Sequence, residues 1–97
     1  MRQLILRAEA RADALEAFSF YEGNRPGLGV EFRNHLDFAL SRIVDGPERY
    51  PFIYKDLRRR LVERFPYAIL YRVYPDAVVV VAVMHGRQDP RVWKRRA

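Results

Sequence analysis

Arginines, together with one histidine, are the residues of this chain best suited to chemistry, and they gather in its second half. From residue 55 onward there are 11 basic and 4 acidic residues, against 7 basic and 8 acidic residues before it. Only Lys55 and Lys94 are lysines, so nearly all these cations are planar guanidinium groups, which match phosphate and carboxylate. The asymmetry indicates a basic surface for nucleic acid or an acidic protein, although any single arginine is equally well explained as part of a solvated face.

The second half also suggests how some of these side chains come together. In a predicted antiparallel meander, the end of the last strand lies near the start of the strand before it, so Arg64, His85 and Arg87 are expected to converge at one sheet edge. Such a group could hold RNA phosphates and support attack by a 2′-hydroxyl. The alternative for His85 is a strand-end residue hydrogen-bonded to backbone. The predicted basic surface comprises Arg58, Arg60, Arg64, Arg72, Arg87 and Arg91.

Several other kinds of chemistry are poorly supported. The chain has no cysteine or threonine, and Ser19 and Ser41 fall inside predicted helices, which argues against a Ser/His/Asp triad. Two histidines without cysteine make a structural zinc site improbable, and Gly27-Leu28-Gly29 lacks the Gly-Lys-Ser/Thr ending of a phosphate loop. We therefore expect no metal and no cofactor. With no apolar run near the roughly 20 residues of a membrane span and no signal peptide, we expect a cytoplasmic protein without a membrane partner.

Two amphipathic helices are predicted behind a short first strand at 2–6. The first helix covers 8–22, a turn follows at 24–27, and the second helix begins at Leu28 or Gly29 and stops at Asp45-Gly46-Pro47. Apolar residues recur at helical spacing in both. The predicted stripes are Ala8, Ala12, Leu15, Phe18 and Tyr21 in the first helix, and Leu28, Phe32, Leu36, Ala39, Leu40 and Ile43 in the second.

The rest of the chain has the character of a sheet. We expect an aromatic loop at 50–54, strands at 57–65, 67–73 and 78–84, and a basic tail at 87–97 anchored by Trp93. The run Val78–Val81 is β-branched throughout, which favours a strand covered on both faces. The order is β-α-α-β-β-β. The prediction is a single α+β domain over 1–97, with an antiparallel sheet and a helical hairpin packed on one face.

Five short motifs together carry a family resemblance over nearly the whole chain. They are Arg25-Pro26-Gly27-Leu28-Gly29, Pro47-Glu48-Arg49-Tyr50-Pro51, Arg64-Phe65-Pro66-Tyr67, Tyr71-Arg72-Val73, and the ending from His85 to Trp93. This pattern resembles the RelE/ParE toxins of type II toxin–antitoxin systems, in particular the ParE-like branch of plasmid-stabilisation proteins. The resemblance implies the RelE/ParE toxin fold and a growth-inhibiting toxin that a cognate antitoxin neutralises.

The resemblance leaves two targets open, because the family divides in mechanism. RelE-like members cleave mRNA on the ribosome, whereas ParE-like members poison DNA gyrase without enzymatic chemistry. Ala68 stands where some nuclease members carry arginine, and His85-Gly86-Arg87 replaces the His/Tyr ending of others. The resemblance therefore favours gyrase. The alternative is a metal-independent, ribosome-dependent endoribonuclease, with Arg64, Arg72, His85 and Arg87 as its catalytic candidates; a third possibility is a module that has lost toxicity and persists as an antitoxin partner.

The expected antitoxin contributes a tail that is disordered until bound. It would lay an amphipathic helix or an added strand against apolar surface of the toxin. The candidate antitoxin-binding residues are Leu15, Phe18 and Phe32 in the helical hairpin.

Overall fold

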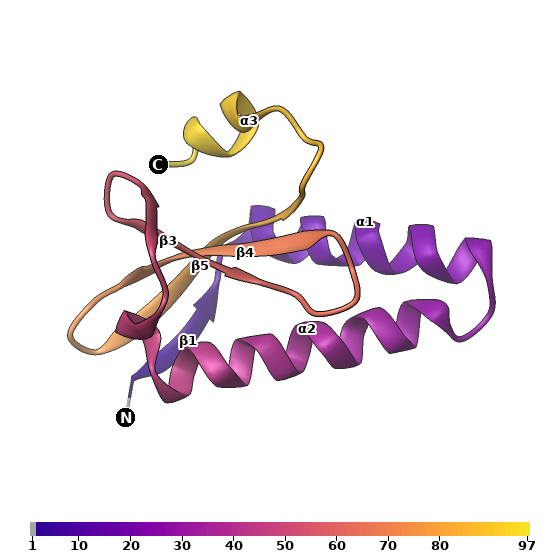
Figure 1. Cartoon of the computed structure of the whole chain (residues 1–97), viewed down its shortest axis with the longest axis horizontal. Coiled ribbons are helices and arrows are strands. Elements are labelled where there is room, and N and C mark those ends of the chain that lie inside the picture. Colours follow the sequence, from indigo (N-terminus) through magenta and orange to yellow (C-terminus); the bar gives the residue numbers. More distant parts are fainter. Residues whose placement is uncertain (1) are drawn as a thin grey trace.

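The computed structural model describes residues 2–97 and contains one five-stranded sheet with two long helices (Figure 1). The strands are β1 (Gln3–Leu6), β2 (Phe52–Tyr54), β3 (Leu57–Leu61), β4 (Tyr67–Val73) and β5 (Ala77–His85), in the spatial order β1-β5-β4-β3-β2. The helices are α1 (Ala8–Asn24), α2 (Leu28–Asp45) and a short α3 (Pro90–Lys94). The predicted α+β class and the β-α-α-β-β-β order are confirmed, with additions described below. Among residues 2–97 no helix has the length and apolar character needed to cross a membrane.

The helices α1 and α2 form a hairpin whose turn is fixed by one carboxylate. Glu22 accepts hydrogen bonds from the backbone N–H groups of Gly27 and Gly29, both at 2.9 Å, and so caps the start of α2. Gly27 has φ of 91°, a left-handed conformation that glycine adopts without strain. A Cβ atom on Gly29 would lie 2.7 Å from the carbonyl oxygen of Phe18, so glycine is required for the close approach of the two helices.

The core-facing side of α2 is the predicted one, but that of α1 is not. Phe32, Leu36, Ala39, Leu40 and Ile43 are all buried as expected. In α1 the buried residues are Ala10 and Ala17, with Ala14 and Tyr21 packed beside them, whereas the predicted Leu15 is 65% exposed. Small alanines let α1 approach the sheet closely, and the larger Leu15 and Phe18 are left for its outer side.

The sheet has two faces, and side chains alternate between them along β4. Ile69 and Tyr71 belong to the main core under the hairpin, while Leu70 belongs to a second cluster on the opposite face with Ala82 and Met84. In β5, Val81 is an extra residue between the partners of Leu70 and Tyr71, a β-bulge that changes which residues face the hairpin. Val78, Val80 and Val81 are fully buried, as the valine run predicts for a central strand.

The chain from 47 onward differs from the prediction at four places. β1 pairs with β5 in parallel, so the sheet is mixed rather than antiparallel throughout. The expected aromatic loop at 50–54 contains the edge strand β2, and a 3-10 turn, Pro47–Arg49, precedes it. β3 ends at Leu61 rather than Phe65, because Arg64 takes a positive φ of 69° in the turn that leads into β4.

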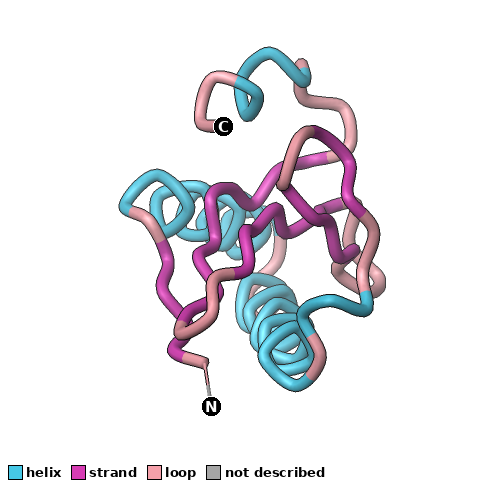
Figure 2. The backbone as a smooth tube through the Cα atoms, turned by 90° about the vertical axis from the view of Figure 1, so that its left-hand side faces the viewer, coloured by secondary structure: helices cyan, strands magenta, loops and turns pink. Residues whose placement is uncertain are grey.

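The fourth difference is the tail, which contains helix α3 and lies against the sheet face away from the hairpin. Trp93 packs on the second cluster, which agrees with its predicted role as an anchor. Figure 2 shows the strands lying between α3 and α2. Arg7 donates a hydrogen bond to the carbonyl oxygen of Arg96, and the side chain of Arg96 pairs with Asp13 at 2.6 Å, so the tail is tied to the β1–α1 junction and to the first half of α1.

Candidate functional site

Arg72, predicted as part of the exposed basic surface and as a nuclease candidate, is a structural residue. Its side chain is only 10% exposed. Its Nε donates to Asp56 at 2.8 Å and its Nη2 donates to the carbonyl oxygen of Ala97 at 2.9 Å. The same contact keeps the pKa of Asp56 below its usual value, chiefly through the hydrogen bond from Arg72. The prediction of an exposed Arg72 is wrong, because its charge is already satisfied within the fold.

Arg58 and Arg60 are likewise engaged. They lie on the hairpin side of β3, opposite Tyr71 and Ile69. Arg58 donates to the carbonyl oxygens of Glu48 and Tyr50 and stacks 3.9 Å from the ring centroid of Phe52. Arg60 pairs with Glu63 at 3.2 Å and has a side chain only 11% exposed. These two arginines hold the 47–52 segment against β3 and leave little charge for a target.

The segments that carry Arg64, His85 and Arg87 do lie side by side. His85 is the register partner of Tyr67, and the N–H of Gly86 donates to the carbonyl oxygen of Pro66 at 2.8 Å. His85 agrees with the alternative prediction of a strand-end residue hydrogen-bonded to backbone, because its Nδ1 accepts a hydrogen bond from the backbone N–H of Arg87 at 3.0 Å. Arg64 and Arg87 are exposed and have no ion-pair partner among residues 2–97, whereas Arg91 pairs with Asp89 at 2.6 Å.

Four further exposed cations in the second half of the chain are missing from the predicted basic surface. Lys55 and Lys94 both approach the ring of Tyr54, with Nζ atoms 5.2 and 5.0 Å from its centroid. Arg59 and Arg95 are also exposed, without an ion-pair partner in the described part of the chain. The available signal was that each lysine directly follows an aromatic residue, Tyr54 or Trp93. The two lysines lie close in space only because α3 docks on the sheet, and no local sequence pattern predicts that docking.

The outer side of the hairpin contains an apolar hollow, which we term the hairpin groove. It has a volume of about 320 Å³ and lies between α1 and α2. Of the three predicted antitoxin-binding residues, Leu15 stands exposed on its wall, Phe18 is half-buried, and Phe32 is fully buried beneath it. Arg11, Arg33 and Asp37 provide the charges around it. Phe32 was wrongly counted as a surface residue, although its side chain still contributes to the floor of the groove.

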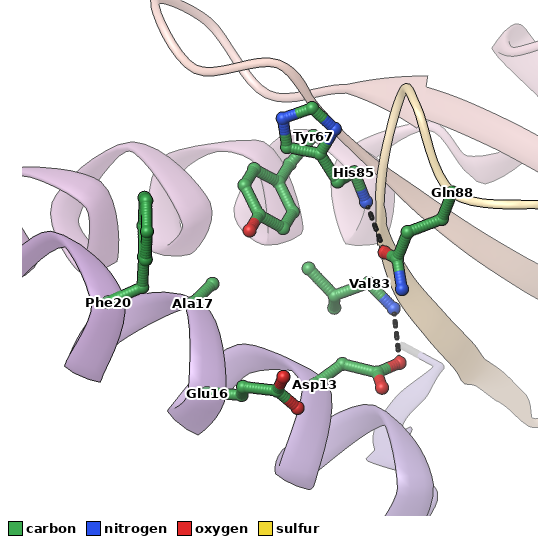
Figure 3. Close-up of a pocket in the computed structure, with 8 residues that line it drawn as sticks. All are labelled: Asp13, Glu16, Ala17, Phe20, Tyr67, Val83, His85 and Gln88. Atoms are coloured by element: carbon green, nitrogen blue, oxygen red, sulfur yellow. Dashed lines mark hydrogen bonds between the residues drawn. The ribbon is translucent and has the colours of Figure 1, made fainter.

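A second hollow lies on the other flank of α1, and we term it the edge cavity (Figure 3). It also measures about 320 Å³ and opens where β5 runs past the end of β1. Its polar lining groups come from α1, from the ends of β4 and β5, and from the segment after β5. Its lining residues are Asp13, Glu16, Ala17 and Phe20 of α1, Tyr67 of β4, Val83 and His85 of β5, and Gln88.

Side chains satisfy the unpaired edge of β5 at this cavity. Asp13 accepts from the backbone N–H of Val83 at 3.0 Å, and Gln88 accepts through Oε1 from the backbone N–H of His85 at 2.7 Å. Arg96 donates to the carbonyl oxygen of Val81 at 3.2 Å while it pairs with Asp13. These contacts occupy the edge groups that an added strand would otherwise pair with.

The electrostatic character of the edge cavity is acidic, in contrast to the chain as a whole. Burial raises the pKa of Tyr67, and the negative charges of Glu16 and Asp13 add to that effect. Asp13 is neutralised by Arg96, but Glu16 is exposed and has no ion-pair partner among residues 2–97. No group of three or more His, Asp or Glu side chains able to hold a metal ion occurs in this described part of the chain.

Comparison with known proteins gives consistent relatives. The family profile described as "ParE toxin of type II toxin-antitoxin system, parDE" matches residues 4–90. Two curated proteins named "Toxin ParE2", from the CDC 1551 and H37Rv strains of Mycobacterium tuberculosis, are each 29% identical over 90 residues, covering 92% of this chain and 86% of the relative. A chain of the structure titled "Chromosomal ParDE TA system from P. aeruginosa" superposes with a TM-score of 0.79 at 16% identity, covering 88% of this chain and 96% of that one, which establishes the likeness of fold.

Proposed function

Because this chain belongs to the ParE toxin family of type II toxin–antitoxin systems, we propose that it arrests growth by trapping DNA gyrase through a protein–protein surface. The proposal includes a cognate antitoxin that neutralises the toxin, and it places both proteins in the cytoplasm with gyrase. The action is non-enzymatic, so the exposed arginines serve for docking rather than for bond cleavage.

The observation that carries this choice of target is that two of the four candidate nuclease residues, Arg72 and His85, are engaged in contacts within the fold. Arg72 is buried in an ion pair with Asp56, away from the solvent that an RNA substrate would occupy. His85 uses Nδ1 to accept a backbone hydrogen bond, which ties that nitrogen to its own turn. A general-acid or general-base role needs a side chain placed within hydrogen-bond reach of the reacting group together with its charged partners.

A protein target is further supported by the outer end of the sheet. Phe52 and Leu61 are 57% and 60% exposed on β2 and β3, and Phe38 of α2 is 51% exposed. The guanidinium of Arg58 stacks on Phe52 with Cζ 3.9 Å from the ring centroid, and Cζ of Arg60 lies 6.0 Å from the centroid of Phe38. Aromatic side chains are enriched among the residues that dominate binding energy at protein interfaces, so the exposed rings rather than the engaged arginines are the proposed contacts.

The test compares two purified reactions, one with gyrase and supercoiled DNA and one with translating ribosomes and a defined mRNA. The expected result is covalent gyrase–DNA cleavage complexes with intact mRNA. Codon-positioned cuts in the mRNA with unaffected gyrase would reverse the proposal. No effect in either reaction would leave the third possibility, a module without toxicity.

The ribosome-dependent nuclease is the second candidate, and the adjacency of the Arg64 turn and the His85–Arg87 segment is the observation that favours it. If it holds, Arg64→Ala and Arg87→Ala each reduce mRNA cleavage at least about tenfold without loss of stability, a rate change equivalent to about 1.4 kcal/mol. Arg95→Ala, which removes another exposed arginine, is the matched control for nonspecific loss of charge and is expected to leave mRNA cleavage unchanged.

The antitoxin is proposed to bind in the hairpin groove, with Leu15 and Phe18 as contact residues above Phe32. An amphipathic helix laid into a groove buries its apolar face and fits this concave, mostly apolar surface. Leu15→Glu is expected to weaken antitoxin binding by about 2 kcal/mol, roughly 30-fold, since it removes a buried leucine contact and introduces a charge. Phe52→Glu, an equally exposed apolar residue on β2, is the matched control and leaves antitoxin affinity unchanged. Equal loss in both variants would place the antitoxin elsewhere.

A further inference from the structure

The edge cavity offers a second contact for a partner of defined chemistry. Its free groups are mixed: the Glu16 carboxylate is unpaired, and Tyr67 presents its hydroxyl to the same space without an intramolecular partner among residues 2–97 (Figure 3). The amide nitrogen of Gln88 remains available, because Gln88 uses its oxygen to accept from His85. The walls between these groups are apolar, formed by Ala17, Phe20 and Val83.

This combination selects among ligand classes. Glu16 and the nearby Asp13 would repel a phosphate, so the cavity disfavours nucleic acid although the chain carries a net charge of +6. A guanidinium group satisfies the site: it donates to the Glu16 carboxylate, and its flat face can lie against the ring of Phe20. Donors such as the Gln88 amide suit the backbone carbonyl groups of the peptide that carries it.

The cavity also lies close to the hairpin groove, the surface proposed for the antitoxin. α1 separates the two hollows, with Leu15 on the groove side and Phe20 on the cavity side. Both side chains stand out from the helix, at 65% and 60% exposure. Because a helix with its side chains is about 10–12 Å across and an extended chain advances about 3.3–3.6 Å per residue, a peptide that fills the hairpin groove reaches the edge cavity after about three to four residues.

We propose that the edge cavity binds an arginine side chain of the antitoxin, carried on an extended segment that crosses α1 from the hairpin groove. This inference rests on the proposed antitoxin interaction and specifies its chemistry. The segment does not extend the sheet at this point, because Asp13, Arg96 and Gln88 already occupy the edge groups of β5. The arginine contributes register and selectivity, since only a cation at the correct spacing reaches Glu16.

The first test uses small probes and the toxin alone, so that its result does not depend on gyrase or on an antitoxin. N-acetyl-arginine amide and its neutral isostere N-acetyl-citrulline amide are titrated into the protein, with backbone amide shifts followed by NMR. The arginine probe is expected to shift the amides of Val83 and Gln88 saturably, with a Kd on the order of millimolar. The citrulline probe is expected to leave them in place.

Two variants of α1 make the test specific. Glu16→Gln is expected to weaken the arginine probe at least about fivefold, whereas Glu9→Gln, an exposed carboxylate two turns away on the same helix, leaves it unchanged. Equal responses to both probes, or full binding by Glu16→Gln, would overturn the proposal. Concentration-dependent shifts of the same amides without any probe would assign the cavity to a second copy of this chain and also overturn it. If the arginine probe binds as described but the toxin acts on neither gyrase nor ribosomes, the arginine site is supported and the proposed gyrase target is contradicted.

Discussion

The arginines of this protein divide by what their guanidinium groups touch. Arg7, Arg72 and Arg96 bind backbone oxygens or carboxylates and fix the tail, while Arg64 and Arg87 project without ion-pair partners among residues 2–97. The sequence prediction places Arg72 on one basic surface with Arg64 and Arg87, because the partners of Arg72 lie 16 and 25 residues away along the chain. An arginine within an apolar strand can therefore serve to hold a distant segment of the chain in place rather than to bind a target.

Replacing Arg72 by methionine should reveal that structural role. Arg72→Met loses the hydrogen bonds to Asp56 and to the Ala97 carbonyl and is expected to lower the free energy of unfolding by about 1–3 kcal/mol. Because Asp56 is exposed and water screens its charge, we expect a loss near the lower figure. Arg87→Met, at an exposed site, is expected to stay within about 0.5 kcal/mol of the wild type. Chemical denaturation measures both. A stable Arg72→Met protein that had lost toxicity would return Arg72 to the functional site.

Tyr71 carries a buried hydroxyl group that makes the free energy of unfolding depend on pH. It is fully buried and donates to the carbonyl oxygen of Pro47 at 2.7 Å, and burial raises the pKa of Tyr71 to about 12. The folded state therefore holds this proton more tightly than the unfolded chain, whose tyrosine ionises near pH 10. The stability that Tyr71 contributes is complete below pH 10 and is lost as the pH rises from about 10 to about 12.

Tyr71→Phe removes both effects at once. At neutral pH the variant is expected to be about 1 kcal/mol less stable, because the Pro47 oxygen loses its donor. Between pH 10 and 12 its free energy of unfolding should fall less steeply than that of the wild type, by roughly 2 kcal/mol over the window, since only the wild type carries this raised pKa. Urea denaturation across that range is the measurement; parallel curves for the two proteins would contradict the assignment.

At the scale of elements, the sequence predicts α2 well and α1 poorly, for a physical reason. α2 carries large apolar residues at helical spacing, so the choice of core face is clear. In α1, alanines occur at 8, 10, 12, 14 and 17, which leaves several faces equally plausible, and the large residues Leu15 and Phe18 point to the outer groove. The parallel pairing of β1 with β5 joins residues more than 70 positions apart, and neither periodicity nor turn chemistry encodes it.

The hairpin also offers two glycines with opposite expectations. Gly29→Ala places a Cβ 2.7 Å from the Phe18 carbonyl oxygen and should cost about 1–3 kcal/mol, because backbone must move to relieve the overlap. Gly23→Ala, inside α1 with nothing within 4 Å of the added Cβ, should stabilise by about 0.5–1 kcal/mol through helix propensity. Thermal and urea denaturation compare the pair. Similar effects for both substitutions would mean that the two helices do not pack as closely as described.

At the scale of the whole molecule, the excess positive charge and the hairpin groove belong to different halves of the chain. The net charge of +6 comes from the second half of the chain, whereas the hairpin groove is apolar and the edge cavity acidic. Long-range attraction and short-range packing therefore act through different parts of the surface. The fold class and the excess of basic residues can be predicted from sequence, whereas the positions of the basic residues and of the two hollows depend on how the elements dock. A partner that wraps around the protein would meet both.

This separation predicts how the antitoxin associates with the toxin. If an acidic antitoxin is drawn by the basic half and held by the hairpin groove, raising the ionic strength from about 50 mM to about 500 mM should slow association at least about tenfold and change dissociation little, because salt screens the approach but not the packed contact. Leu15→Glu should do the reverse and accelerate dissociation, since the leucine lies in the groove and not on the basic half. Stopped-flow measurement of both rate constants separates the two effects. Association that is independent of salt would mean that the basic half of this chain does not face its antitoxin and is reserved for the growth-arresting target.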